Sequence, residues 1–350
     1  MENVVLSQGR TRFALAHGAT IALYQRFNIN SLQATARVEE APQAQFLGGE
    51  AYAHVPVPDA SPRLAAGVLL RACRPRQWSK NLLVLAAPAA AGVIDRPLVA
   101  AQAAGALVVM CLLSSATYLL NDVRDVEQDR LHPHKRSRPV AAGEMPPRAA
   151  LLAAAALALT GLGLATAITP GLGAVGCCYL ALTASYSLWL RYVVVLDILA
   201  IAAGFVLRAL AGGVATDIYL SRWFVIVTGC CAIFLVTAKR YAELREQTGS
   251  GVTARTTLRR YSLGHLRLTL LTAAAIACVA YTGWAFTRPA HVVWYGLSIV
   301  PFVLWLSRYA VLIGAGAGQA PEELILRDRT LLALSLLWSF LFLGGVYVGH

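Results

Sequence analysis

Long apolar segments separated by short polar stretches fill the chain from Leu64 onward. A helix that crosses a membrane needs about 20 mostly apolar residues. The first apolar segment is short and contains Pro88, so we expect it to tilt, to kink or to borrow residues from the 64–75 stretch. The nine predicted spans are approximately 80–95, 98–120, 149–168, 172–190, 193–214, 221–238, 267–286, 291–313 and 330–349.

Residues 1–62 have a different character, because no apolar run in them is long enough to span a membrane. Arg10, Arg12 and Arg26 interrupt the apolar core that a secretory signal would need. Acidic residues and prolines make 39–62 resemble a linker. We therefore predict an N-terminal extension over 1–62, to which the sequence assigns no function, followed by one transmembrane domain over 63–350.

The composition supports a membrane protein. Hydrophobic residues make up 57% of the chain and charged residues 14%, and the mean hydropathy is +0.59. Soluble domains contain about 25% charged residues, so this chain has too few to cover a soluble globule. An ordinary soluble enzyme, a disordered protein and a nucleic-acid-binding module are excluded on this ground. The predicted fold class is all-α, a polytopic bundle.

The charge of +12 is distributed unevenly between the predicted loops. Most Arg and Lys residues precede the first span or follow spans two, four, six and eight, while the opposite loops are nearly free of them. The excess of Arg and Lys in cytoplasmic loops then places the N-terminus and the active face in the cytoplasm. A basic excess of this kind marks orientation, and no nucleic-acid partner is expected.

An acidic cluster follows the second span. Asn121, Asp125 and Asp129 are spaced four residues apart, so on a helix they share one face, and Asp122 lies beside them. Oxygen ligands gathered in this way repel one another unless a cation is bound, and Mg²⁺ prefers such ligands together with substrate phosphates. The cluster predicts a Mg²⁺–diphosphate site, with ordinary surface acids at a helix end as the alternative.

Basic residues follow the acidic cluster at once. Lys135, Arg136 and Arg138 lie where they could neutralise phosphate oxygens in the same pocket. His132 and His134 form a His-x-His pair, which we interpret as loop residues in preference to metal ligands.

The pattern N-D-x-x-D-x-x-x-D, followed by R-x-R-P-x-x-x-G from Arg136 to Gly143, resembles the UbiA-type intramembrane prenyltransferase superfamily. The resemblance covers about 65–350. It implies nine transmembrane helices around a central cavity in the inner (plasma) membrane. It also implies two acidic motifs that bind Mg²⁺ and a diphosphate on the cytoplasmic side.

The second acidic motif of that superfamily, D-x-x-x-D, is missing after the sixth span. Residues 238–246 contain Lys239, Arg240, Glu243 and Glu246, and the sequence leaves open which glutamate replaces the motif. Together with the segments 74–81 and 205–213, this region closely resembles the decaprenyl-phosphate phosphoribosyltransferase branch. The resemblance implies transfer of 5-phosphoribose from phosphoribosyl pyrophosphate to a polyprenyl phosphate, for the arabinan and arabinogalactan of cell walls.

Further polar residues are candidates for substrate binding. Tyr186 and Arg191 match a tyrosine and a basic residue that the superfamily has near the diphosphate, with interfacial anchoring as the alternative. Arg208 lies inside an apolar span and should face a cavity or an acid, because a charge there is costly. Arg76 and Lys80 precede the first span and are candidates to bind the lipid phosphate. Lys239, Arg240 and Glu243 are candidates to bind the diphosphate donor.

Two other functions remain open from the sequence. An aromatic prenyltransferase of quinone biosynthesis would carry the second aspartate motif that this chain lacks. A transporter would explain the spans and Arg208, but it would leave the acidic cluster beside a basic loop unexplained. The oligomeric state is also open, with a homo-oligomer as one option.

Overall fold

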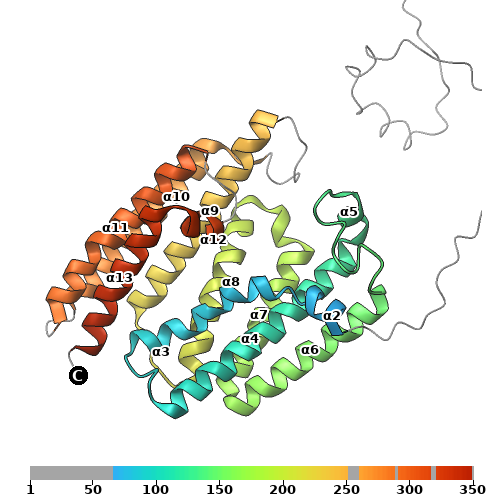
Figure 1. Cartoon of the computed structure of the whole chain (residues 1–350), viewed down its shortest axis with the longest axis horizontal. Coiled ribbons are helices and arrows are strands. Elements are labelled where there is room, and N and C mark those ends of the chain that lie inside the picture. The colour runs from blue at the N-terminus through green and yellow to red at the C-terminus, as the bar shows by residue number, and fades with distance from the viewer. Residues whose placement is uncertain (1–65, 251–259, 288–290, 317–320, 349–350) are drawn as a thin grey trace, which may run out of the picture. The chain divides into compact units, whose positions relative to one another are not determined.

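The computed structural model describes residues 66–250, 260–287, 291–316 and 321–348. The chain divides into two units, Met1–Ser61 and Pro62–His350, and the description below concerns the second. The predicted N-terminal extension over 1–62 lies outside the described residues. Within the described ranges all regular structure is helical (Figure 1).

The helices follow one another with short connections. In chain order they are α2 (Ala66–Ala72), η2 (Pro75–Leu85), α3 (Ala86–Ala90), α4 (Pro97–Arg124), α5 (Val126–Leu131), α6 (Pro147–Ile168), α7 (Pro170–Leu188), η3 (Leu190–Tyr192), α8 (Val194–Ala215), α9 (Arg222–Ser250), α10 (Leu263–Phe286), α11 (Val292–Gly314), α12 (Pro321–Arg327) and α13 (Arg329–Tyr347), where η denotes a 3₁₀-helix.

Eight of these helices, α4, α6 to α11 and α13, are long and apolar enough to cross a membrane, counted over the described residues. They coincide with the last eight predicted spans to within a few residues, except that α9 continues well beyond 238. The all-α, multi-pass fold is therefore confirmed. Helix boundaries follow local chemistry, because α4, α6 and α7 begin with proline, whose missing amide proton costs nothing there.

The first predicted span, 80–95, has a different structure. It consists of the 3₁₀-helix η2 and the five-residue α3, neither of which is long enough to span a membrane as a regular helix. Pro88 lacks an amide proton and its ring crowds the carbonyl group four residues earlier, which disfavours a continuous α-helix through this segment. Nine spans is therefore an approximate number.

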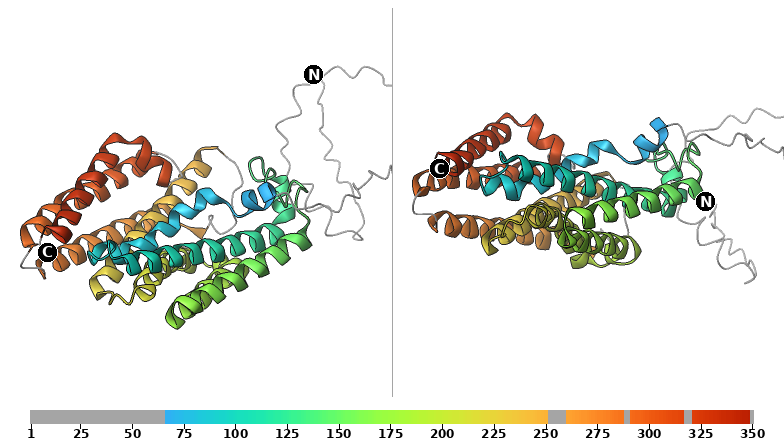
Figure 2. Two further views of the ribbon diagram at one scale, coloured as in Figure 1. Left: turned by 60° about the horizontal axis from the view of Figure 1, so that its bottom comes forward. Right: turned by 90° about the horizontal axis from the view of Figure 1, so that it is seen from below.

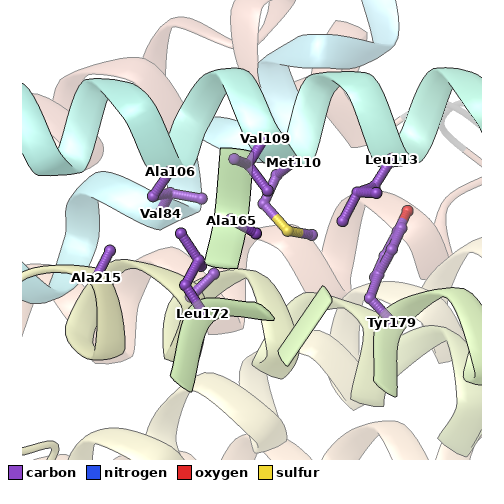
Figure 3. Packing of buried hydrophobic residues seen from close by; sticks show 10 residues of the cluster. Val84, Ala106, Val109, Met110, Leu113, Ala165, Leu172, Tyr179 and Ala215 are labelled. Carbon is purple, nitrogen blue, oxygen red and sulfur yellow. The ribbon is translucent and has the colours of Figure 1, made fainter. Parts of the chain in front are cut away.

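The long helices pack mainly against their neighbours in the chain (Figures 1 and 2). One hydrophobic cluster joins α4, α6, α7 and α8, and Figure 3 shows Val109, Met110 and Leu113 of α4 facing Leu172 and Tyr179 of α7. A second cluster joins α9, α10, α11 and α13. η2 packs against α4 and α8.

Small residues allow α11 and α13 to approach closely. An added Cβ atom at Gly345 would lie 2.7 Å from the ring of Tyr295, which is buried among Trp284 and Phe342. At Gly296, in α11, an added Cβ atom would meet nothing within 4 Å. The two positions differ in packing, although both lie inside helices.

We predict that Gly345→Ala destabilises the protein while Gly296→Ala does not. Overpacking a buried contact costs about 1–3 kcal/mol, which exceeds the gain of up to about 1 kcal/mol in helix propensity that both substitutions share. Thermal unfolding in detergent micelles measures the difference. Equal melting temperatures for the two variants would contradict this packing between α11 and α13.

Candidate functional site

The predicted acidic cluster lies where α4 ends and α5 begins. The helix is interrupted at Asp125, whose φ and ψ are −96° and 13°. Hydrogen bonds nevertheless continue across the break, from Asp125 N to Asn121 O (2.9 Å) and from Asp129 N to Asp125 O (2.8 Å). The predicted helical spacing of Asn121, Asp125 and Asp129 is therefore retained in the backbone.

Two acids of this cluster are buried and paired with arginines. Asp122 is 1% exposed; its Oδ1 accepts hydrogen bonds from Arg74 and, at 3.2 Å, from Arg138. Asp129 is 3% exposed and its Oδ2 lies 2.6 Å from Arg138 Nη1. Arg138 thus joins the end of α4 to α5. Asp122 Oδ2 is buried and accepts no hydrogen bond from the described residues.

The other two residues of the cluster contact the end of α7 and η3. Ser187 donates a hydrogen bond to Asn121 Oδ1 (2.6 Å). Arg191 binds both carboxylate oxygens of Asp125, at 3.1 and 3.2 Å. This hydrogen-bonded pairing with Asp125 raises the pKa of the Arg191 guanidinium above its usual value, so the group stays charged. Arg124 donates hydrogen bonds to the carbonyl oxygens of Ser187 and Leu188 at the end of α7. The last carbonyl groups of a helix have no partner within the helix, so Arg124 caps this end.

A second buried ion pair lies between α8 and α9. Asp197 accepts hydrogen bonds from Arg240 Nε (2.7 Å) and Nη2 (2.9 Å), and both side chains are almost fully buried. Tyr186 donates to Asp197 Oδ1 (2.9 Å) and Tyr261 to Oδ2 (3.3 Å). Arg240 Nη1 also binds Glu243 (2.7 Å). Burial, followed by the charge of Asp197, raises the pKa of Tyr261, so its hydroxyl remains a donor.

The end of α7 and η3 connect the two clusters. Within six residues, Tyr186 contacts Asp197, Ser187 contacts Asn121, and Arg191 contacts Asp125. The structure therefore brings Asn121, Asp125, Tyr186, Arg191, Arg240 and Glu243 into one continuous polar network at one end of the bundle.

The other basic residues predicted to bind substrate are mostly exposed. Arg76, Arg136 and Lys239 are exposed, and Lys135 is half-buried in the loop after α5. Lys80 donates a hydrogen bond to Gln77 Oε1 (2.6 Å).

Arg208 differs from the expectation that it faces a cavity or an acid. It is 7% exposed, and its hydrogen bonds go to Asn81 Oδ1 (2.7 Å), the Gly204 carbonyl oxygen (2.7 Å) and the Tyr179 hydroxyl (2.9 Å). All three partners are neutral oxygens. Their hydrogen bonds, with the rings of Tyr179 and Phe205 within 6 Å, compensate the lost hydration of the charge without a carboxylate.

An apolar cavity of about 790 Å³ lies beside η2 and α3, bounded also by α8, α9, α10, α11 and α13. Aromatic side chains dominate its far wall, among them Phe205, Trp223, Tyr281 and Trp338. Lys80 is the one charged residue among the described residues that line it. A cavity of this size and polarity suits a large apolar ligand that carries a single anionic group.

The donor chemistry at the end of α4 fits a divalent cation. Asn121, Asp122, Asp125 and Asp129 supply hard oxygen ligands, and the buried Asp122 Oδ2 still lacks a donor. In the arrangement described, however, arginines bind the carboxylates, and no three acidic, histidine or cysteine side chains among the described residues converge as metal ligands. Metal binding would therefore require arginines to release carboxylate oxygens.

Sequence reasoning did not assign several members of this network to the site. Arg74 and Ser187 were unassigned, although Arg74 begins the segment 74–81 that carries the resemblance. No local pattern pairs Asp197 with Arg240, which lies on another helix. Tyr261 gave no signal, because its position beside Asp197 depends on how α10 begins.

Similarity to known proteins extends over most of the chain. The sequence profile of the UbiA prenyltransferase family matches residues 82–336. A decaprenyl-phosphate phosphoribosyltransferase of Mycolicibacterium smegmatis is 42% identical over 291 residues, covering 79% of this chain and 92% of that protein. The enzyme of the same description from Mycobacterium tuberculosis is 43% identical over 280 residues, with the same coverage.

The fold has a similar solved structure. A UbiA homologue from Archaeoglobus fulgidus bound to DMAPP and Mg²⁺ superposes with a TM-score of 0.62, covering 80% of this chain and 98% of that one. The two sequences are 17% identical, so this likeness concerns the fold alone.

We predict that Asp197→Ala strongly destabilises the protein. Removing one partner of a buried ion pair costs about 3–5 kcal/mol, because the other charge stays buried without compensation. Asp95→Ala, at an exposed acid, is the control and should leave the melting temperature nearly unchanged. Thermal unfolding in detergent tests this prediction. A melting temperature for Asp197→Ala close to that of the control would contradict the stabilising role of the Asp197–Arg240 ion pair.

Proposed function

The chain belongs to the UbiA prenyltransferase family, and we propose that it transfers 5-phosphoribose from phosphoribosyl pyrophosphate to decaprenyl phosphate and releases pyrophosphate. The observation that carries the proposal is the identity of 42–43% to decaprenyl-phosphate phosphoribosyltransferases, over 79% of this chain and 92% of theirs. The product would supply arabinan and arabinogalactan precursors of the cell wall.

The charges of the polar network suit phosphoribosyl pyrophosphate, a donor that carries phosphate groups on two positions of its ribose. Arg74, Arg138, Arg191 and Arg240 each have a carboxylate partner, so this network alone is close to neutral. Lys135, Arg136 and Lys239 add positive charge around it. A site with this balance attracts a polyanion, and guanidinium groups bind phosphate in a bidentate manner.

We assign the metal-binding role to Asn121, Asp122, Asp125 and Asp129, with Mg²⁺ as the cation. A bound Mg²⁺ neutralises charge on a pyrophosphate leaving group and orients it. The solved A. fulgidus homologue, which is described as bound to Mg²⁺, supports a divalent metal in this fold. Arg138 and Arg191 release carboxylate oxygens in this scheme and bind donor phosphates in exchange. Their exchange keeps every buried charge paired before and after the donor binds.

The second polar cluster explains why the usual aspartate motif is dispensable for this donor. Arg240 occupies the corresponding segment of α9, where Asp197 and Glu243 hold it in one orientation. Tyr186 contacts the same carboxylate of Asp197. We propose that Arg240, oriented by Asp197, Glu243 and Tyr186, faces the donor phosphates, with Lys239 as a nearby exposed charge.

The acceptor lipid fits the apolar cavity. Its polyprenyl chain would lie against the aromatic wall, and its phosphate would bind Lys80, with Arg76 close by in the chain. A phosphate oxygen then attacks C1 of the ribose as the bond from C1 to the pyrophosphate oxygen breaks. Because a phosphate monoester is ionised at neutral pH, this step needs no strong general base. The distribution of basic loops supports an active site on the cytoplasmic side of the inner membrane.

We predict that the purified protein with Mg²⁺ transfers labelled phosphoribose from phosphoribosyl pyrophosphate to decaprenyl phosphate. Asp125→Ala should lower the rate at least about 100-fold. Loss of a residue that only orients a metal ligand costs about 10- to 100-fold, and Asp125 is assigned as a ligand itself. Asp95→Ala, an exposed acid outside the network, should retain the wild-type rate.

Two outcomes would contradict the proposal. Full activity of Asp125→Ala would remove the metal assignment. Turnover of a prenyl diphosphate with an aromatic acid, and none with phosphoribosyl pyrophosphate, would instead identify an aromatic prenyltransferase.

A further inference from the structure

η2 is an unusual element, because it continues as a 3₁₀-helix for eleven residues. Runs of this kind longer than three or four residues are uncommon, since their hydrogen-bond geometry is poor. It also begins after Arg74 in the left-handed region, at φ 56°. Contacts with other helices must therefore hold η2 in this conformation.

The first such contact is a buried polar network. Asn81 is fully buried; it accepts a hydrogen bond from Arg208 Nε at 2.7 Å and donates to Ser114 Oγ at 3.2 Å. Tyr179 accepts a hydrogen bond from Arg208 on the other side, at 2.9 Å. Asn81 of η2 is in this way tied to α4, α7 and α8 at once.

The second contact is a close approach of two backbones. An added Cβ atom at Gly212 of α8 would lie 1.7 Å from the carbonyl oxygen of Val84 in η2. Only glycine allows this approach. Arg208 and Gly212 are four residues apart, so they lie on one face of α8 and contact η2 at Asn81 and Val84 respectively.

Other residues of η2 line the cavity, namely Ser79, Lys80, Leu82 and Leu83. Asn81 and Val84 are buried against α8, while Lys80 brings the one charge of the cavity lining. The contacts of Arg208 and Gly212 therefore determine where Lys80 lies relative to the cavity.

We propose that Asn81, Arg208 and Gly212 are positioning residues for the acceptor: by fixing η2 they hold Lys80 where it binds the phosphate of the lipid. Arg208 acts through η2 and does not touch substrate. The inference rests on the proposed function for the identity of the acceptor. The inference also gives Arg208 a role. This buried cation has neutral hydrogen-bond partners among the described residues and takes no part in the proposed donor site.

The test compares Gly212→Ala with Gly163→Ala, a helical glycine of α6 whose added Cβ atom meets nothing within 4 Å. KM is measured separately for decaprenyl phosphate and for phosphoribosyl pyrophosphate. We expect Gly212→Ala to raise the KM for the lipid at least about tenfold, because the backbone of η2 must shift, and to leave the KM for the donor within about twofold. Gly163→Ala should match the wild type in both.

Tyr179→Phe provides a milder second variant in case Gly212→Ala does not fold. It removes one hydrogen bond of Arg208 and keeps the ring, so the KM for the lipid should rise about three- to tenfold with the donor KM unchanged. Equal changes in both KM values, or an unchanged lipid KM in the variants that fold, would overturn the positioning role.

Direct binding separates this inference from the proposed reaction. Quenching of tryptophan fluorescence by decaprenyl phosphate, without any donor, reports on a cavity that Trp223, Trp284 and Trp338 line. Wild-type binding that Gly212→Ala weakens supports the inference even if phosphoribose transfer is absent. Equal affinities of wild type and Gly212→Ala overturn the inference while transfer stands, and no binding by the wild type overturns both.

Discussion

The buried ion pair between Asp197 and Arg240 is the interaction on which the arrangement of the polar end depends. Two charges that are each almost fully buried stabilise a fold only when every oxygen and guanidinium proton finds a partner. Tyr186, Tyr261 and Glu243 supply these partners from α7, from the segment just before α10 and from α9 itself. The pair thereby sets the relative positions of the helices that carry the predicted donor-binding residues.

The same physical rule holds along the membrane-spanning segments. Buried charges of the described residues have partners inside the protein: Asp122 and Asp129 pair with Arg138, and Arg208 binds neutral oxygens and lies beside aromatic rings. In the proposed scheme, arginines that hold helices together would bind phosphate groups once a metal takes their place on the carboxylates. In that scheme stability and donor binding share these residues, and η2, which begins after Arg74, also lines the cavity proposed for the acceptor.

Features that depend on residues close together in the sequence could be predicted, whereas contacts between residues far apart in the sequence could not. Hydrophobic length predicts the eight long helices, and the spacing of Asn121, Asp125 and Asp129 predicts a helical arrangement that the backbone retains. The segment 80–95, which is expected to tilt or kink at Pro88, is irregular in the structure, where the close contact of Val84 with Gly212 accompanies a 3₁₀-helix. Partners such as Arg240 for Asp197, 43 residues apart, depend on tertiary packing that no local pattern contains.

The exchange of arginine partners is tested most directly by a crystal structure, grown in a lipidic mesophase, with phosphoribosyl pyrophosphate and Mn²⁺ bound. We expect an anomalous peak for the metal within bonding distance of Asp125 and Asp129. Arg138 and Arg191, now paired with those carboxylates, should instead contact phosphate oxygens of the donor. A donor bound elsewhere, with both arginine–carboxylate pairs intact, would contradict the exchange.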